Sequence, residues 1–188
     1  MATTVDIKKG VALKFRNDVY LVLDFQHVKP GKGGAFVRTR LKSLTTGKII
    51  DQTFNSGEEI DLVTVQRRKY QFLYSDEAGY HFMDQNTFEQ VTLDADMVDG
   101  KEFLKEGQEV EIVFDAETDR ALSCELPLHV VLKVTYAEPA VKGDTANNPM
   151  KKATLETGAE ILVPMFVESG IYVKVDTRTG EYVERVKD

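Results

Sequence analysis

The sequence VALKFRNDVYLVLDF, residues 11–25, contains two runs rich in branched and aromatic side chains, separated by a polar break at residues 16–18. Such runs favour β-strands, and a short polar break between them predicts a hairpin. Residues 35–41 then alternate apolar and basic side chains, as a strand with one solvent-facing side does. A turn at residues 45–47 leads into another strand at 48–54, so this region predicts a small, curled antiparallel barrel.

A second set of strands occupies residues 65–126 and is interrupted by one predicted helix, at residues 96–104. Asp94 or Asp96 would cap this helix and Gly107 would lie beyond its end. Several strands with one helix before the last two are typical of a five-stranded oligonucleotide-binding (OB) barrel, although other small barrels share this pattern. Aromatic side chains in these strands are expected to form its core, with base-stacking platforms as the alternative: Tyr70, Phe72, Tyr74, Tyr80 and Phe82.

A third set of short strands follows Pro127, so the sequence predicts an all-β protein of three small β-barrels in tandem. We expect the three units at residues 1–64, 65–126 and 127–188. Units of about 60 residues are only marginally stable alone. Close packing between neighbouring units would offset that weakness.

Composition places the chain among ordinary folded proteins of the cytoplasm. Of its 188 residues, 42% are hydrophobic, and no run approaches the roughly 18 apolar residues of a membrane span. The N-terminus lacks the basic and then apolar pattern of a signal peptide. The single cysteine, Cys124, excludes an internal disulfide and suits a reducing compartment. We therefore expect a cytoplasmic protein with no membrane partner. A monomer is expected as well, although the sequence does not determine the oligomeric state.

Charge is distributed unevenly along the chain, whose formal net charge is −7. Residues 1–64 carry 10 basic against 7 acidic side chains, or +3, whereas residues 65–126 carry 6 against 15, or −9. Residues 28–50 hold six basic residues and no acidic one. A basic stretch on an acidic body indicates contact with a polyanion through one part of the molecule, although a solvated basic sheet face would give the same count.

No pattern of an enzyme site is found in the sequence. The histidines His27, His81 and His129 lack the spacing of metal ligands, and glycine-rich phosphate-binding motifs are absent. Cys124 lies in an alternating strand, where a buried structural thiol is more common than a nucleophile. We therefore predict no catalytic residue, no metal and no cofactor.

One loop is unusual: HVKPGKGGA, residues 27–35. Pro30 and Gly31 suit the central positions of a type II turn, and Gly33 and Gly34 remove bulky neighbours. The loop is thus predicted to present Lys32 at a hairpin tip that phosphate groups or a modifying enzyme could approach closely. A flexible turn with a passive lysine is the alternative.

Two longer strings resemble one protein family. The string HVKPGKGGAFVRTRLKSL, residues 27–44, resembles the first-domain tip of elongation factor P and of the archaeal and eukaryotic factor that carries hypusine. The string KKATLETGAEILVPMFVESG, residues 151–170, is similar to the long signature of elongation factor P at every fixed place: Lys151, Ala153, Gly158, Ile161, Val163, Pro164, Val167 and Gly170.

The resemblance implies a fold, partners and a role. The fold would be an SH3-like (KOW-type) barrel followed by two OB-fold barrels, with an L-shaped outline like that of tRNA. The factor would bind the 70S ribosome between the peptidyl and exit sites and relieve stalling at consecutive prolines by positioning the peptidyl-tRNA. Lys32 would carry an extension added by a lysine-modifying enzyme.

The resemblance also implies two contact surfaces. The first would hold peptidyl-tRNA or ribosomal RNA, and its residues are Lys29, Pro30, Gly31, Lys32, Gly33, Arg38, Arg40 and Lys42. The second, in the third unit, would approach the small subunit and the exit-site codon through Gly143, Asp144, Thr145, Ala146, Tyr182 and Arg185. Asn147 and Asn148 depart from the family's glycine-rich continuation of that loop, which leaves the codon contact open.

Two alternatives remain at this stage. A paralogue similar to elongation factor P would share the fold, but the intact PGKGG tip and the full third-unit signature favour elongation factor P itself. A general single-stranded RNA-binding barrel protein would have an unmodified Lys32. The mass of the native protein distinguishes the second alternative.

Overall fold

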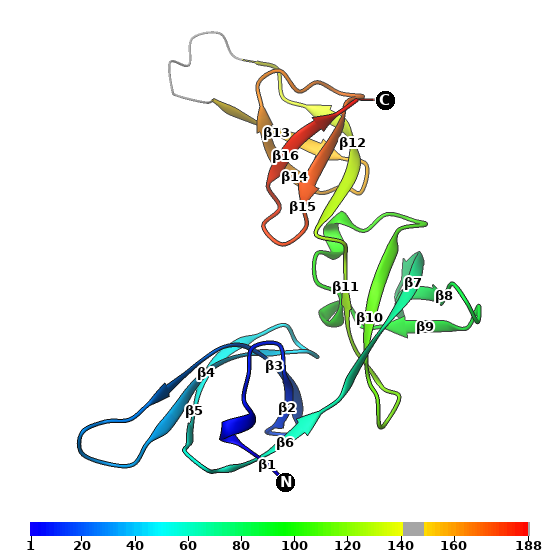
Figure 1. The fold of residues 1–188 in the computed structure, drawn as a ribbon. Helices are drawn as coiled ribbons and strands as arrows, with labels where there is room; N and C mark the ends of the chain where they lie inside the picture. Colours follow the sequence, from blue (N-terminus) through cyan, green and yellow to red (C-terminus); the bar gives the residue numbers. More distant parts are fainter. Residues whose placement is uncertain (141–148, 188) are drawn as a thin grey trace.

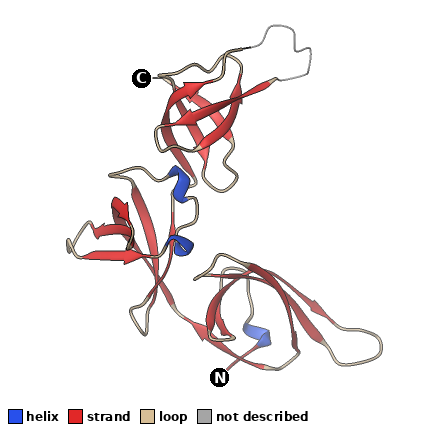
Figure 2. Cartoon of the chain, turned by 180° about the vertical axis from the view of Figure 1, so that it is seen from behind, coloured by secondary structure: helices blue, strands red, loops and turns tan. Residues whose placement is uncertain are grey.

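The chain is built almost wholly from β-strands. The computed structural model describes residues 1–140 and 149–187, in which three antiparallel sheets follow one another and each curls on itself (Figure 1). The view from behind shows a bent row, with the first and third sheets at opposite ends (Figure 2). The described residues contain three single-turn 3-10 helices and no α-helix: Thr4–Asp6 (η1), Ala95–Met97 (η2) and Lys101–Phe103 (η3). None of these helices is long and apolar enough to span a membrane.

The first sheet has six strands in the order β1-β6-β2-β3-β4-β5. They are Ala2–Thr3 (β1), Ala12–Phe15 (β2), Asp18–Val28 (β3), Phe36–Ser43 (β4), Ile49–Asn55 (β5) and Glu59–Val63 (β6). The predicted hairpin turn is confirmed, because Phe15 pairs with Asp18 while Arg16 and Asn17 take positive φ angles of 50° and 64°. Two left-handed residues between paired strands form the type I′ turn, whose twist matches that of the strands.

Alternation along β4 sorts its side chains between the barrel interior and solvent. Val37, Thr39 and Leu41 are buried, whereas Arg38 and Arg40 are exposed. The period of two in the sequence is therefore the period of the strand, and the basic side chains lie on its outer face. Apolar side chains from five segments fill the interior: Ile7, Leu13, Val22, Val37, Leu41 and Phe54.

The second sheet has five strands in the order β11-β10-β7-β8-β9. They are Val65–Asp76 (β7), Gly79–Asp84 (β8), Gln90–Leu93 (β9), Glu109–Asp115 (β10) and Ala121–Glu125 (β11). Tyr70, Phe72 and Phe82 are buried in its core, as predicted, and Tyr80 packs against it. The prediction is wrong for Tyr74, which is 47% exposed. The register shifts between Phe72 and Tyr74, and such a bulge turns the following side chain away from the face that a strict period of two would give it.

The predicted helix at residues 96–104 does not form. Two single turns, η2 and η3, take its place, and Val98 between them has extended geometry and bridges Cys124. Gly100 follows with a left-handed φ of 74°, which ends any continuous ladder of helical hydrogen bonds. Asp94 does occupy the cap position of η2, but its side chain makes no capping hydrogen bond.

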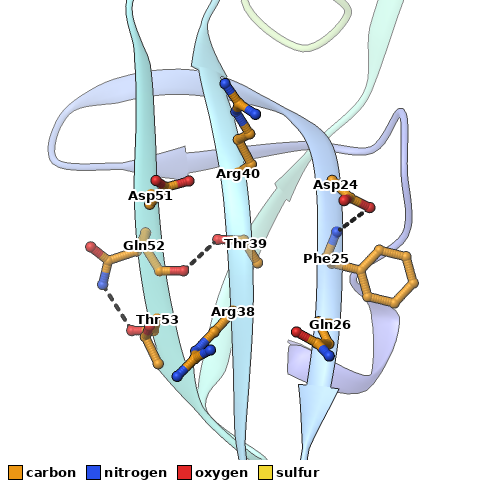
Figure 3. A pocket seen from close by; sticks show the side chains of 9 residues that line it. All are labelled: Asp24, Phe25, Gln26, Arg38, Thr39, Arg40, Asp51, Gln52 and Thr53. Atoms are coloured by element: carbon orange, nitrogen blue, oxygen red, sulfur yellow. Dashed lines mark hydrogen bonds between the residues drawn. The ribbon is translucent and has the colours of Figure 1, made fainter.

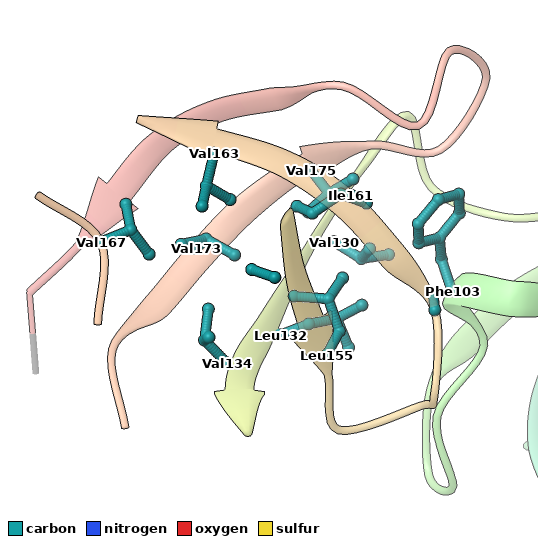
Figure 4. Packing of buried hydrophobic residues seen from close by; sticks show 12 residues of the cluster. Phe103, Val130, Leu132, Val134, Leu155, Ile161, Val163, Val167, Val173 and Val175 are labelled. Atoms are coloured by element: carbon teal, nitrogen blue, oxygen red, sulfur yellow. The ribbon is translucent and has the colours of Figure 1, made fainter. Parts of the chain in front are cut away.

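The third sheet has five strands in the order β14-β13-β12-β15-β16. They are His129–Ala137 (β12), Met150–Leu155 (β13), Glu160–Pro164 (β14), Tyr172–Asp176 (β15) and Tyr182–Val186 (β16). Its core consists mainly of valines and leucines, among them Leu132, Val163 and Val173 (Figure 4). One core member, Phe103, comes from η3 rather than from this sheet (Figure 4). The second and third barrels thus share part of their interior.

Candidate nucleic-acid interface

The candidate site lies at the end of the β3–β4 hairpin, which projects from the first barrel (Figure 1). Val28 pairs with Phe36, so residues 29–35 form the connecting loop and Lys32 is its central residue. The side chains of the loop are exposed from Lys29 to Gly34. A long two-stranded ribbon therefore carries a lysine away from the body of the barrel, where bulky nucleic acid can reach it.

The glycines of this loop serve its backbone and leave the space around it open. A Cβ atom added at Gly31, Gly33 or Gly34 would meet no heavy atom within 4 Å. Gly33 has a φ of +103°, a conformation that residues with side chains rarely adopt. The predicted type II turn at Pro30–Gly31 is wrong, because such a turn needs positive φ at Gly31 and the positive angle is at Gly33. A loop of this length, residues 29–35, connects the two strands without a tight two-residue turn.

Within the described part of the chain, Lys32 has no acidic partner close enough to neutralise it. Among residues 1–140 and 149–187, the ion pairs within 4.0 Å involve neither Lys29 nor Lys32. Both ammonium groups are therefore available to an incoming anion such as a phosphate. The predicted presentation of Lys32 at an exposed tip is what the geometry gives.

The outer face of the hairpin forms a shallow hollow of about 410 Å³ (Figure 3). Arg38 and Arg40 project from β4 on this face. It is lined by Asp24, Phe25, Gln26, Arg38, Thr39, Arg40, Asp51, Gln52 and Thr53. Thr39 donates a hydrogen bond of 2.8 Å to the carbonyl of Gln52, which ties β4 to β5 beneath the arginines. Two guanidinium groups on a polar floor suit phosphate groups.

Arg38 and Arg40 differ in their surroundings. The strand partners of Arg40 are Asp24 on β3 and Asp51 on β5, whereas those of Arg38 are the uncharged Gln26 and Thr53. The guanidinium of Arg38 lies 5.4 Å from the ring centroid of Phe36, within the range of a cation–π contact. The basic count of residues 28–50 conceals these two flanking carboxylates, because they come from strands on either side.

Lys42, which was predicted to bind RNA, points toward the second unit. Its ammonium donates to the carboxylate of Asp99 and forms an ion pair with it. The side chain of Lys42 is only 31% exposed. The structure therefore separates Lys42 from the exposed pair Lys29 and Lys32 and places it at the junction between barrels.

The residues predicted at the other end of the molecule are only partly described. Arg185 on β16 is exposed, while Tyr182 is half-buried and packs against the third core. Gly143, Asp144, Thr145 and Ala146 lie outside the described residues. The third barrel and the loop between β3 and β4 lie at opposite ends of the molecule (Figure 1), so the two predicted contact surfaces are separate.

Comparisons with known proteins agree with this arrangement of three units. The family models "Elongation factor P (EF-P) KOW-like domain", "Elongation factor P (EF-P) OB domain" and "Elongation factor P, C-terminal" match residues 3–60, 65–118 and 130–185. The chain belongs to the elongation factor P family. It is a translation elongation factor by family, with a KOW-like barrel followed by OB-type barrels.

Relatives in this family match over their whole length. Elongation factor P of Amoebophilus asiaticus is 57% identical over 187 residues, covering 100% of this chain and 98% of the relative. Elongation factor P 1 of Porphyromonas gingivalis is 52% identical over 188 residues, covering 100% of both. A solved structure, "Eukaryotic translation initiation factor 5A from Methanococcus jannaschii", has a TM-score of 0.52 at 23% identity and covers 67% of this chain and 90% of its own. At that identity the structural likeness speaks for the fold alone.

The other side chains of this elongation factor P family member that could act as a nucleophile or metal ligand have no such role in the structure described. Cys124 is buried in the second barrel, and burial raises the pKa of its thiol to about 12. The thiol therefore stays protonated near neutral pH and is a poor nucleophile. No group of three or more His, Cys, Asp or Glu side chains in the described part of the chain is arranged to hold a metal ion.

Sequence reasoning missed one surface feature, a cluster around His81. Its imidazole Nε2 lies 2.8 Å from Asp76 and its Nδ1 lies 2.9 Å from the hydroxyl of Thr92. The exposed ring of Tyr74 stacks on it with centroids 4.4 Å apart. The bulge that exposes Tyr74 leaves no clear signal in the sequence, because aromatic side chains alternate without a break through residues 70–74.

Proposed function

We propose that this chain binds the ribosome between the peptidyl and exit sites. The first-unit tip would point at the acceptor end of the peptidyl-tRNA, and the third unit would approach the small subunit and the exit-site codon. The observation that carries the proposal is the exposed Lys32 at the centre of a glycine-rich loop, at the opposite end of the molecule from the third barrel. Family membership supports it.

The proposed role of Lys32 is to position a reacting group. A cationic arm that hydrogen-bonds the tRNA backbone restricts the donor to geometries from which the peptide bond can form. Restriction of this kind can remove several kcal/mol of barrier, without an acid, base or nucleophile from the protein. Proline benefits most, because its ring restrains the geometry of donor and acceptor. The ribosome remains the catalyst.

The surrounding basic residues would hold the first unit against nucleic acid. Lys29 is exposed in the loop, and Arg38 is exposed with the uncharged strand partners Gln26 and Thr53, so we expect these two to make the stronger phosphate contacts. Arg40 would contribute less, because Asp24 and Asp51 flank it. Contacts of this kind position the protein without reading sequence. Tyr182, Arg185 and residues 143–146 would form the second contact, in the third unit.

Other parts of the proposal follow from the same placement. We expect a lysine-modifying enzyme to act on Lys32, since the open backbone around it leaves room for an active site. We also expect three domains, at residues 1–64, 65–126 and 127–188, in a monomer that works in the cytoplasm, where translation takes place. Intact-mass measurement of protein purified from its native cell would test the modification, and an unmodified Lys32 would reject that part.

The central experiment compares Lys32→Ala with Lys48→Ala, a matched exposed lysine of the same barrel. We expect Lys32→Ala to lower synthesis of a Pro-Pro-Pro reporter while ribosome binding stays largely intact, because the other contacts remain. Lys48→Ala should match the wild type. Equal reporter output from Lys32→Ala and wild type would reject the positioning role. Equally tight binding to free single-stranded RNA and to ribosomes would favour a general RNA-binding protein instead.

A further inference from the structure

Residues 98–103 contact all three barrels in turn. Val98 is 3% exposed, belongs to the core of the second barrel and bridges Cys124. Because Val98 is extended and Gly100 has a φ of 74°, the chain changes direction at each step where a helix would have kept one axis. Neighbouring side chains are thereby aimed at different partners. Because two single turns replace the predicted helix, this segment can contact all three barrels.

Asp99 joins this segment to the first barrel. Its carboxylate accepts a hydrogen bond from Lys42 on β4. A Cβ atom at Gly47 would lie 3.2 Å from its Oδ1, so the carboxylate fits closely against the β4–β5 turn. An apolar cluster lies beside this contact and unites Val113 and Leu122 of the second barrel with four residues of the first: Ala12, Val19, Leu44 and Val63.

Gly100 and Phe103 join the same segment to the third barrel. A Cβ atom at Gly100 would lie 3.1 Å from the carbonyl oxygen of Thr177. Phe103 is 4% exposed and packs within the third core (Figure 4). A Cβ atom at Gly180 would lie 3.3 Å from Cζ of this ring. The phenyl ring thus lies closely against Gly180, while Gly100 admits the backbone of Thr177.

Further contacts reinforce the second junction, which is the one between the second and third barrels. The hydroxyl of the buried Thr177 donates to the carbonyl of Pro127 at 2.8 Å, in the segment that joins the two barrels. Lys105, just after η3, forms an ion pair of 3.4 Å with Glu156 of the third unit. Leu126 packs against the cores of both barrels. Barrels joined by exposed linkers alone are expected to move independently, whereas these share buried side chains.

We propose that Asp99 and Phe103 are positioning residues that fix the first and third barrels on the middle one. Together they would set the reach from Lys32 to the ribosome contact of the third unit. The inference rests on the proposed function for its consequence, but the fixed geometry stands on the contacts alone. Because Lys32 lies at the end of a long hairpin, a small rotation at Asp99 would displace it by ångströms. A displacement of about 1 Å can cost up to about 100-fold in rate.

Distances between spin labels test the geometry directly. Ser56→Cys, Gln90→Cys and Glu160→Cys place labels on exposed sites of the first, second and third units, and the buried Cys124 escapes labelling. The pairs 56–90 and 90–160 then report on one junction each. The test variants are Asp99→Ala and Phe103→Leu. Glu102→Gln, an exposed change in the same segment, is the control.

Each variant should affect one pair only. Asp99→Ala should broaden the 56–90 distance distribution about twofold and leave 90–160 narrow, and Phe103→Leu should do the reverse. Asp99→Glu, which keeps the charge, should restore part of the narrow distribution. Gly180→Ala, which presses on the same ring, is a second route to the second junction. Broad distributions in the wild type, or unchanged widths in every variant, would overturn the proposal.

The Pro-Pro-Pro reporter then tests the consequence, with Lys32→Ala as the reference. We expect both Asp99→Ala and Phe103→Leu to lower reporter output by about threefold or more. Broadened distances with full reporter output, in cells where Lys32→Ala lowers it, would reject the positioning role. If Lys32→Ala itself has no effect, the proposed function fails, and the label distances still decide whether the junctions are fixed.

Discussion

The hairpin tip around Lys32 and the junction around Phe103 use glycine for opposite purposes. At the tip, Gly33 has open space around it, and its role is to let the backbone turn and remain accessible. At the junction, Gly100 and Gly180 lie against Thr177 and Phe103, and their role is to admit a neighbour. The tip is therefore free to change without loss of the fold, while the junction supports the fold and touches no proposed ligand. This contrast predicts a clean separation between effects on function and effects on stability.

The largest expected effect is that of Phe103→Ala. Removal of a buried phenyl ring from the core of the third barrel should lower the free energy of unfolding by about 3–5 kcal/mol. Urea denaturation followed by circular dichroism measures this loss. A loss below about 1 kcal/mol would mean that the ring contributes little and that the two barrels are joined in another way.

Matched substitutions of Gly180 and Gly33 should sharpen the contrast. Both glycines have positive φ angles, of +72° and +103°, so alanine strains the backbone by about 1–2 kcal/mol at either position. Gly180→Ala must in addition displace the ring of Phe103, whereas Gly33→Ala meets nothing. We therefore expect Gly180→Ala to be the more destabilising in urea denaturation. The reverse order would show that the tip is packed.

The strands and the tip around Lys32 can be predicted from the sequence, whereas the junction around Phe103 cannot. Local periodicity located most strands, and the run PGKGG located the exposed tip, because both depend on residues close together in the chain. The junction depends on partners far apart in sequence. No residue near Asp99 in the sequence indicates that it pairs with Lys42. The segment has helical spacing of its apolar residues and a cap residue, which favour a helix, but in the fold Val98 instead bridges Cys124. The same limit hid Asp24 and Asp51 beside Arg40.

Acid should weaken the body of the molecule through three similar turns. Asp84, Asp115 and Asp176 each begin a D-x-x-T sequence and accept backbone N–H groups two and three residues ahead. Those donors hold the pKa of each carboxyl below its ordinary value. A pKa that is lower in the folded state gives stability above the unfolded pKa of about 3.9, and this stability is lost as pH falls through the folded pKa.

The measurement is the free energy of unfolding from pH 7 downward. The free energy of unfolding of the wild type should decrease once the pH drops below about 4. The triple variant Asp84→Asn, Asp115→Asn, Asp176→Asn keeps an oxygen acceptor at each turn but no longer titrates, so its curve should be flatter. An equal slope in both proteins would assign acid sensitivity to other carboxyls. Residues 25–50, which include the hairpin tip, contain no Asp or Glu, so the tip adds no carboxyl to this acid dependence.

The smallest expected effect on stability is that of Lys32→Ala, and it completes the separation. Lys32 is exposed, and among the described residues it takes part in no ion pair within 4.0 Å, so its removal should change the free energy of unfolding by less than about 0.5 kcal/mol. The same substitution is the one expected to reduce the Pro-Pro-Pro reporter. A loss of function without a loss of stability requires that the ammonium acts on a molecule outside the chain. If Lys32→Ala instead destabilised the first barrel measurably, reporter loss could follow from unfolding alone, and the tip would no longer differ in kind from the junction.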